Sequence, residues 1–131
     1  MSEQDNVQTI VKIYEAFGRG DVPYILGQMT DDVRWVVHLD PVVPWAGDFS
    51  TRARVGGFFS ALNEHAETML FEPKEFIAQG DTVVSTGEYA FRARGSGKSS
   101  RGPWVFIWKL RDGKVYSYEQ FHDPSAAAVF R

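Results

Sequence analysis

The stretch from Arg101 to Asp123, RGPWVFIWKLRDGKVYSYEQFHD, constrains the fold of this chain more than any other. Its first half is rich in aromatic and β-branched residues, which favour strands. The central Asp112-Gly113 pair tolerates the positive φ values that a tight hairpin turn requires. The second half, from Lys114 to His122, again alternates in polarity. The stretch therefore predicts a β-hairpin of two long strands.

Successive side chains of a strand point to opposite faces, so each strand of this hairpin has two distinct sides. One face of the first strand carries Trp104, Phe106, Trp108 and Leu110. One face of the second strand carries Tyr116, Tyr118, Gln120 and His122, and its other face carries Val115, Ser117, Glu119 and Phe121. Aromatic faces with a few polar tips are typical of a pocket wall, and the alternative is a dry core with polar edges.

The rest of the chain predicts three helices before most of the strands. Helical spacing of apolar residues covers 5–18 and 51–66, and a second helix begins after Asp21 with Ile25, Leu26 and Met29 as its buried stripe. Thr30-Asp31-Asp32 reads as a turn. A mostly apolar strand, buried on both faces, is expected at 33–39 and a loop with a folded-in Trp45 at 40–49.

Two further strands are predicted at 69–78 and 82–94, followed by a flexible loop at 95–100. Pro73 places the first of them at a sheet edge or a bulge. Asp123 and Pro124 predict a short C-terminal helix with Asp123 as its N-cap. Because helices come first and strands last, the fold class is α+β with an antiparallel sheet. The length of 131 residues fits one domain over 1–131.

Composition excludes several classes of function. The net charge is −3, so the chain lacks the basic excess of a nucleic-acid-binding protein. It has no cysteine, and hence neither disulfides nor thiolate chemistry. No apolar run approaches the roughly 20 residues of a membrane span. The polar start MSEQDNVQ lacks the apolar core of a signal peptide, so we expect a cytoplasmic protein.

The sequence contains no complete phosphate-loop motif and no specific metal-ligand spacing. The loop GSGKSS resembles part of a phosphate loop, but Arg92 occupies the position of the required first glycine. A loop between strands also lacks the helix N-terminus that binds phosphate. The spacing of His38, Asp40, His122 and Asp123 carries no metal-ligand signal, so no metal and no cofactor are expected.

Short motifs along nearly the whole chain resemble one superfamily. They are GRGD after the first helix, TDDV before the first strand, PWAG and VGGFFSAL around the third helix, QGDTVV, KLRDGKV and FHDP. Together they resemble the SnoaL-like, ketosteroid isomerase-related branch of the nuclear transport factor two-like superfamily. The resemblance implies a cystatin-like α+β barrel: a cone-shaped, curved sheet wrapped around three helices, with a ligand pocket inside. It also implies a homodimer.

Known catalytic positions of that superfamily map only in part onto this chain. The tyrosine of ketosteroid isomerases falls on Ile13, one residue before Tyr14, and their protonated aspartate falls on Phe106. Their carboxylate base corresponds to Asp40, before a proline. The acid of the epoxide hydrolases falls on Gln120, and an amide cannot act as a general base. The resemblance thus argues against either of these two reactions in its known form.

Candidate catalytic residues are His38, Asp40 and His122. His38 and Asp40 share a strand face, and His122 ends the last strand, so the three are expected to line one cavity. Imidazole and carboxylate groups together suit acid–base chemistry. The expected ligand-binding residues are Tyr14, Trp35, Trp45, Trp104, Phe106, Trp108, Tyr118 and Gln120.

These residues predict a small-molecule pocket protein. The leading hypothesis is a cofactor-free isomerase, cyclase or dehydratase that acts on an apolar, carbonyl-containing metabolite by proton transfer, resembling a ketosteroid isomerase or polyketide cyclase. The alternatives are a non-catalytic binding module for a hydrophobic small molecule and a dimeric interaction protein without a ligand. The homodimer is expected to form through an apolar outer sheet face that includes Val105, Ile107, Val115 and Phe121.

Overall fold

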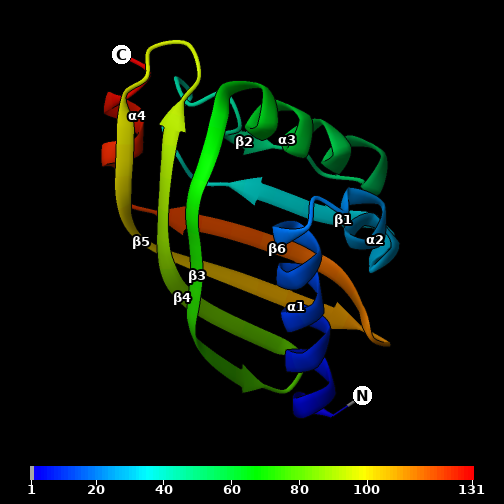
Figure 1. The fold of residues 1–131 in the computed structure, drawn as a ribbon. Coiled ribbons are helices and arrows are strands. Elements are labelled where there is room, and N and C mark those ends of the chain that lie inside the picture. Colours follow the sequence, from blue (N-terminus) through cyan, green and yellow to red (C-terminus); the bar gives the residue numbers. More distant parts are fainter. Residues whose placement is uncertain (1) are drawn as a thin grey trace.

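The structure, a computed structural model, describes residues 2–131 and contains one curved sheet with four helices (Figure 1). The helices are α1 (Glu3–Gly18), α2 (Val22–Gly27), α3 (Arg52–His65) and α4 (Ser125–Ala128). The strands are β1 (Met29–Val37), β2 (Gly47–Asp48), β3 (Ala66–Gln79), β4 (Thr82–Ala93), β5 (Ser99–Arg111) and β6 (Lys114–His122). The predicted α+β class is confirmed.

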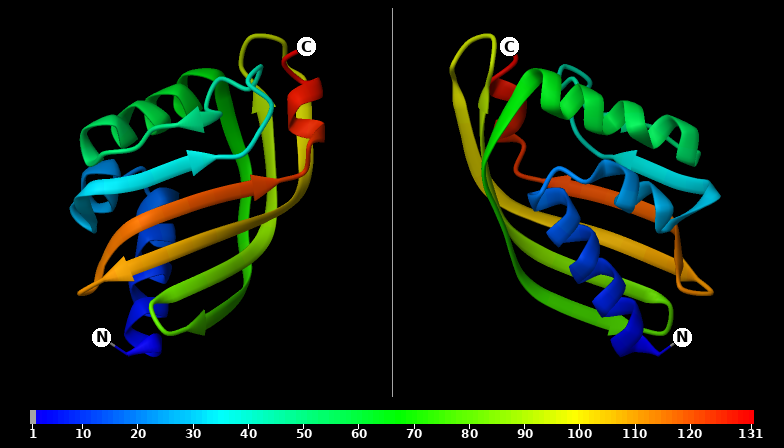
Figure 2. Two further views of the ribbon diagram at one scale, coloured as in Figure 1. Left: turned by 180° about the vertical axis from the view of Figure 1, so that it is seen from behind. Right: turned by 45° about the vertical axis from the view of Figure 1, so that its right-hand side comes forward.

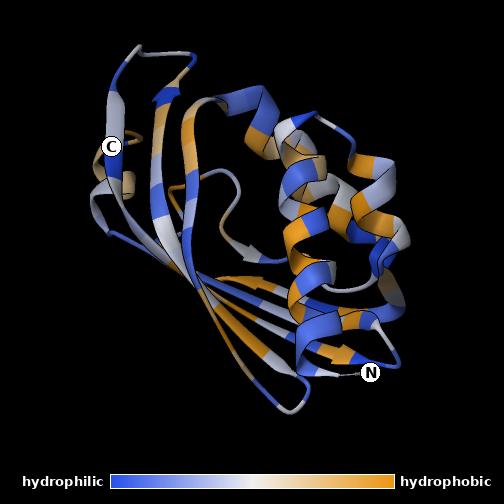
Figure 3. Cartoon of the chain, turned by 60° about the horizontal axis from the view of Figure 1, so that its bottom comes forward, coloured by the Kyte–Doolittle hydropathy of each residue, from blue (hydrophilic) through white to orange (hydrophobic). Residues whose placement is uncertain are grey.

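The strand order is β2-β1-β6-β5-β4-β3, with β1 parallel to β6 and every other neighbouring pair antiparallel. The sheet bends around its concave side, and α1, α2 and α3 all lie on that side (Figure 2). Strands β2 and β3 form its edges, so the sheet is an open cone and does not close into a barrel. Orange apolar segments alternate with blue polar ones along the strands (Figure 3).

Local sequence accounts for the starts of the first two helices. Ser2 and Asp5 form a capping box, in which each side chain accepts a hydrogen bond from the other residue's backbone N–H, at 3.0 and 3.2 Å. Helix α1 therefore begins slightly earlier than the predicted residue 5. Asp21 caps α2 by accepting a 3.1 Å hydrogen bond from the Tyr24 N–H, as its sequence context predicts.

The central hairpin forms as predicted, with positive φ at both turn residues, 52° at Asp112 and 79° at Gly113. One assignment next to the turn is wrong. The register shifts after Lys109, so that Leu110 pairs with Val115 and Tyr116 is the extra residue of a bulge. As a result Val115 is fully buried and does not belong to the outer face.

Strand β1 differs from its prediction in both extent and burial. It begins at Met29, which is buried in the sheet and not on α2, and the predicted turn at 30–32 lies within the strand. Its burial alternates: Trp35 is buried while Arg34 is exposed, so only one face is covered. The cause is its place beside β6, where one face meets α3 and the other lacks a covering helix.

The remaining boundaries shift by a few residues. β3 begins at Ala66, directly after α3, and is an edge strand with register shifts near Thr68 and Pro73, as the proline predicts. β5 already begins at Ser99, within the predicted loop. The loop after β1 contains the two-residue strand β2, and its Trp45 is buried against Phe91 and Phe130.

Asp123 lies one residue before the N-cap position of α4, which Pro124 occupies. Its carboxylate nevertheless accepts a 2.7 Å hydrogen bond from the Ser125 N–H at the helix start. The predicted capping interaction is therefore present, shifted by one residue. None of the helices described within residues 2–131 is long and apolar enough to cross a membrane.

Candidate functional site

A cavity of ≈ 100 Å³ lies between the concave face of the sheet and the helices. Its wall is mostly aromatic. All eight predicted ligand-binding residues line it: Tyr14, Trp35, Trp45, Trp104, Phe106, Trp108, Tyr118 and Gln120. All four tryptophans of the chain are among them. The inward faces of β5 and β6 thus form the wall of a pocket at the position that the hairpin pattern indicates.

A glycine on β4 shapes this aromatic wall. A Cβ atom at Gly87 would lie 2.3 Å from Cζ2 of Trp104 and equally close to the Glu72 carbonyl oxygen. The indole of Trp104 therefore lies close against the β4 backbone at Gly87, and it stacks on Phe106 and Phe71 with ring centroids 4.1 and 5.0 Å away. Only glycine at position 87 leaves room for this stack.

Two hydrogen-bonded pairs supply polar groups within the wall. Trp108 Nε1 donates to the Tyr14 hydroxyl oxygen at 2.9 Å, and the Tyr118 hydroxyl donates to Gln120 Oε1 at 2.5 Å. Burial raises the pKa of both tyrosines well above the ordinary value. Both hydroxyls therefore stay protonated at neutral pH, and they are hydrogen-bond donors rather than bases.

His122 lines the cavity at the end of β6, across the ladder from Trp104. Its ring lies 4.7 Å from that of Tyr89. Burial lowers the pKa of His122 to about 4, and the nearby Asp123 opposes this effect only in part. Its Nδ1 is buried and has no hydrogen-bond partner among residues 2–131. At neutral pH the site thus holds an uncharged imidazole with one unused nitrogen.

The other two candidate catalytic residues do not line this cavity, which corrects the expectation that they meet His122. His38 lies just past β1 on the outer face, where its ring stacks on Phe121 at 4.5 Å and its Nε2 is 3.2 Å from Glu119. Asp40 is exposed and pairs with Arg131. The reason is strand alternation: Trp35 and Val37 face inward, so His38 faces outward.

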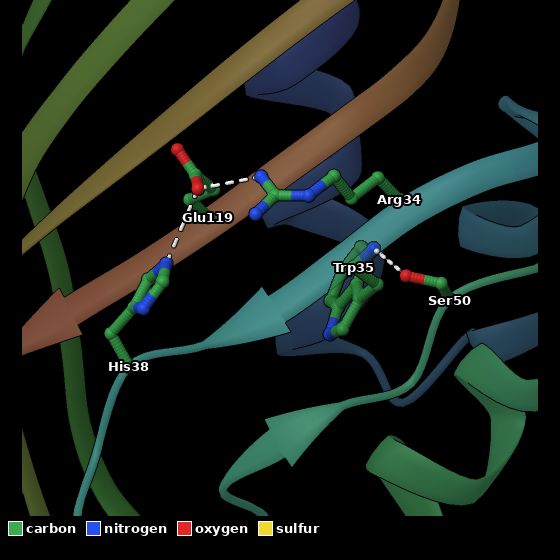
Figure 4. Close-up of polar contacts among 5 residues, drawn as sticks. All are labelled: Arg34, Trp35, His38, Ser50 and Glu119. Carbon is green, nitrogen blue, oxygen red and sulfur yellow. Dashed lines mark hydrogen bonds and ion pairs between the residues drawn. The ribbon is translucent and has the colours of Figure 1, made fainter.

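The outer face holds its own small polar cluster, shown in Figure 4. Arg34 and His38 both contact the carboxylate of Glu119, with Arg34 at 2.6 Å, while Trp35 lies on the other side of β1. These contacts lower the pKa of Glu119, with the Arg34 hydrogen bond as the main cause. The cluster is separated from the cavity by the sheet.

Sequence reasoning missed several wall residues, namely Phe58, Phe59, Phe71, Tyr89 and Phe91. Phe58 and Phe59 belong to the apolar stripe of α3, and Tyr89 and Phe91 alternate along β4. Period-two alternation on β4 was the signal that could have found the latter pair. No group of three or more His, Asp or Glu side chains within residues 2–131 is arranged to hold a metal ion.

An α+β cone with an aromatic internal cavity defines a class of small pocket proteins. The model of the SnoaL-like domain family matches residues 10–118, and the chain belongs to this family. The match thus extends over most of the chain, including the second half of α1, all of α2 and α3, and nearly the whole sheet. No match was found among curated proteins.

Solved structures show the same fold. An NTF2-like protein from Burkholderia xenovorans LB400 is 31% identical, with 99% of this chain and 98% of that chain covered and a TM-score of 0.88. An NTF2-like protein from Burkholderia pseudomallei K96243 is 28% identical, with 99% of this chain and 98% of that chain covered and a TM-score of 0.84. TerC, co-crystallised with polyporic acid, is 27% identical, with 96% of this chain and 97% of that chain covered and a TM-score of 0.78.

Proposed function

We propose that this protein is a cofactor-free enzyme that transfers a proton on an uncharged, apolar, carbonyl-containing metabolite. The observation that carries the proposal is the unpartnered Nδ1 of His122 in a cavity with an aromatic wall. A buried polar atom without a partner is costly, and a ligand that bonds to it removes this cost. The co-crystallisation of the relative TerC with polyporic acid supports a small-molecule role.

His122 is the proton acceptor in this proposal. Among the side chains that line the cavity, none carries a carboxylate or a fixed charge, within residues 2–131. The tyrosines remain protonated, because burial raises their pKa. The neutral imidazole is therefore the group that can take a proton from carbon next to a carbonyl. The same lack of charge favours an uncharged ligand, since a buried ion without a partner is strongly disfavoured.

Gln120 is the proposed donor to the oxyanion that forms when this proton leaves. Tyr118 donates to the Oε1 of Gln120 and so fixes the orientation of the amide. The amide N–H groups then point away from Tyr118 and are available to a ligand oxygen. Gln120 and His122 are two residues apart on one face of β6, about 7 Å along the strand. A ketone placed between them directs its oxygen to Gln120 and its α-carbon to His122.

Non-catalytic binding of a hydrophobic molecule is the second candidate function, and one observation favours it. A general base works best when its pKa lies near the operating pH. The pKa of His122 is lowered to about 4, so its imidazole is a weak base in the empty cavity. A ligand that is held without reaction would need the aromatic wall and the amide but not the histidine.

Exchange of carbon-bound hydrogen tests the two candidates against each other. Phenylacetone, one aromatic ring with acidic protons beside a ketone, is incubated with the protein in D2O and followed by proton NMR. We expect exchange well above buffer for the wild type and its loss in His122→Gln. The matched controls His38→Gln and His65→Gln change the chain's other histidines, which lie outside the cavity, and should retain the activity.

Binding is measured in parallel by intrinsic fluorescence, because all four tryptophans line the cavity. A wild type that binds phenylacetone without accelerating exchange would favour the binding module. If His38→Gln loses exchange and His122→Gln retains it, the reaction takes place on the outer face and the proposed site is wrong.

A further inference from the structure

The internal cavity is small for a ligand of ordinary size. Its volume of ≈ 100 Å³ is less than that of an engineered cavity of about 150 Å³ that takes up benzene. Pockets for metabolites and drug-sized ligands span about 300–1,000 Å³. One ring is therefore the most that the cavity can hold, and any larger ligand needs further space.

A groove of ≈ 1050 Å³ adjoins the cavity between α1, α3 and β3. It reaches the surface, because exposed Ser60 and Asn63 lie on its wall. The groove and the cavity share eight wall residues: Tyr14, Phe17, Ile25, Phe59, Leu62, Thr68, Leu70 and Phe71. The two spaces are therefore the outer and inner parts of one depression.

Phe17, Phe59 and Phe71 separate these two parts. Their ring centroids are 6.4 Å apart between Phe17 and Phe59 and 5.1 Å apart between Phe17 and Phe71. All three are only partly buried, in contrast to the fully buried tryptophans behind them. Because Phe17 contacts both other rings, a ligand that spans the two parts must displace these side chains.

Glycine residues leave the groove open on the helix side. Gly18 at the end of α1 and Gly56 within α3 both line it, and a Cβ atom at either would meet no atom within 4 Å. Gly56 lies inside a helix, where glycine costs about 1 kcal/mol relative to alanine. Neither close packing nor positive φ requires glycine there. The absence of a side chain at Gly56 keeps the groove wide.

We propose that the ligand is an elongated molecule with one uncharged aromatic ring in the cavity and the remainder along the groove beside Gly56. The proposal rests on the proposed function, since it names the shape of the ligand for the same site. The outer end meets polar groups: Arg94 lines the groove, and its Nε donates to the Asn63 carbonyl oxygen at 2.8 Å. A polar outer end on the ligand matches this rim.

A pair of ketones and a pair of variants test the inference through binding alone. Phenylacetone has one ring, and biphenyl-4-ylacetone extends it by a second ring. Gly56→Leu places a side chain in the groove. Gly57→Leu is the matched control, because Gly57 is the next residue of the same helix, is exposed and does not line either space. Both variants should melt no lower than the wild type, since leucine favours helices.

We expect the wild type to bind biphenyl-4-ylacetone about tenfold more tightly than phenylacetone, from the added apolar area. Gly56→Leu should decrease the affinity for biphenyl-4-ylacetone about tenfold and change the affinity for phenylacetone by less than about twofold. Gly57→Leu should change neither affinity. Equal affinities of the wild type for the two ketones, or a Gly56→Leu variant that binds both like the wild type, would overturn the extension into the groove.

These outcomes are distinct from failure of the proposed function. If phenylacetone binds and undergoes exchange while the longer ketone binds no more tightly, the proposed reaction stands and only the elongated ligand is excluded. If both ketones bind as expected and no exchange occurs, the elongated ligand stands and the protein is a binding module. If neither changes the tryptophan fluorescence, the cavity is not a site for aryl ketones, and both proposals fail.

Discussion

The indole N–H of Trp108 on β5 donates a 2.9 Å hydrogen bond to the hydroxyl oxygen of Tyr14 on α1. Both side chains are buried, and both line the cavity. The Tyr14 ring also makes edge contacts with Trp104 and Phe71, with centroids 5.9 and 5.2 Å away. This bond and the aromatic contacts together connect the first helix to the pocket wall that the hairpin provides.

Replacing Tyr14 by phenylalanine removes the acceptor and leaves the Trp108 N–H buried without a partner. A lost partner for a buried polar group costs about 1–3 kcal/mol, so we expect a decrease of that size in the free energy of unfolding of Tyr14→Phe. Urea denaturation followed by tryptophan fluorescence measures it. Tyr116→Phe is the matched control at the bulge and should stay within about 0.5 kcal/mol of the wild type. Equal stabilities of the two variants would show that the Tyr14 bond contributes nothing.

Replacing Gly87 by alanine adds a single methyl group and should clearly decrease the stability of the fold. The new Cβ would lie 2.3 Å from both Trp104 and a backbone oxygen, so the strand or the aromatic stack must move. Overpacking of this kind costs about 1–3 kcal/mol. Thermal unfolding should show a clear decrease, together with altered tryptophan fluorescence. Gly95→Ala, where a Cβ would meet no atom within 4 Å, is the control and should melt like the wild type.

The hairpin was predictable from sequence because its signals are local: a turn pair at Asp112-Gly113 and alternating aromatic residues on both sides. The same alternation places the pocket wall correctly from Trp104 to Trp108 and from Tyr118 to His122. It fails at Val115, because a bulge adds one residue and reverses the faces near the turn. Nothing local distinguishes this bulge from a regular ladder.

The expectation that His38 and Asp40 line the cavity with His122 was wrong. Trp35 and His38 were both expected to face the pocket, although a separation of three residues puts them on opposite faces of a strand. The apolar run from Val33 suggested burial on both faces, which hid this conflict. The tertiary structure decides which face of β1 is buried. β1 lies parallel to β6, and the helices cover only its inner face. The groove beside Gly56 was beyond reach, because it depends on how α1, α3 and β3 are placed in space.

The low pKa of His122 should decrease the free energy of unfolding in mildly acidic solution. Burial holds the pKa of His122 at about 4 in the folded chain, against about 6.5 when unfolded. Between these values the unfolded chain binds a proton that the folded chain does not. The contribution of the uncharged His122 to the free energy of unfolding is therefore fully present above about pH 6.5. It is lost as the pH falls toward 4, by on the order of 3 kcal/mol.

His122→Gln isolates this contribution, because glutamine does not titrate. Urea midpoints of the wild type and the variant are compared at several values between pH 7 and pH 4.5. The free energy of unfolding of the wild type, relative to that of the variant, should decrease steadily as the pH falls, and hydrogen exchange of phenylacetone should fall only near pH 4. A difference that is constant over this range would mean that the pKa of His122 is not lowered by folding.

We expect the protein to form a homodimer through the outer face of its sheet. Val105 and Phe121 are 36% and 38% exposed there, and an apolar sheet face in water needs a cover. Glu119 is already paired with Arg34 beside them, so its carboxylate would not enter an interface over this face unpaired. Light scattering at micromolar concentration should give twice the mass of one chain.

Phe121→Arg should give the mass of one chain, whereas Met69→Arg, at a residue 56% exposed on the wall of the groove, should leave the dimer intact. A wild type with the mass of one chain, or a Phe121→Arg variant that still dimerises, would exclude this face as the interface.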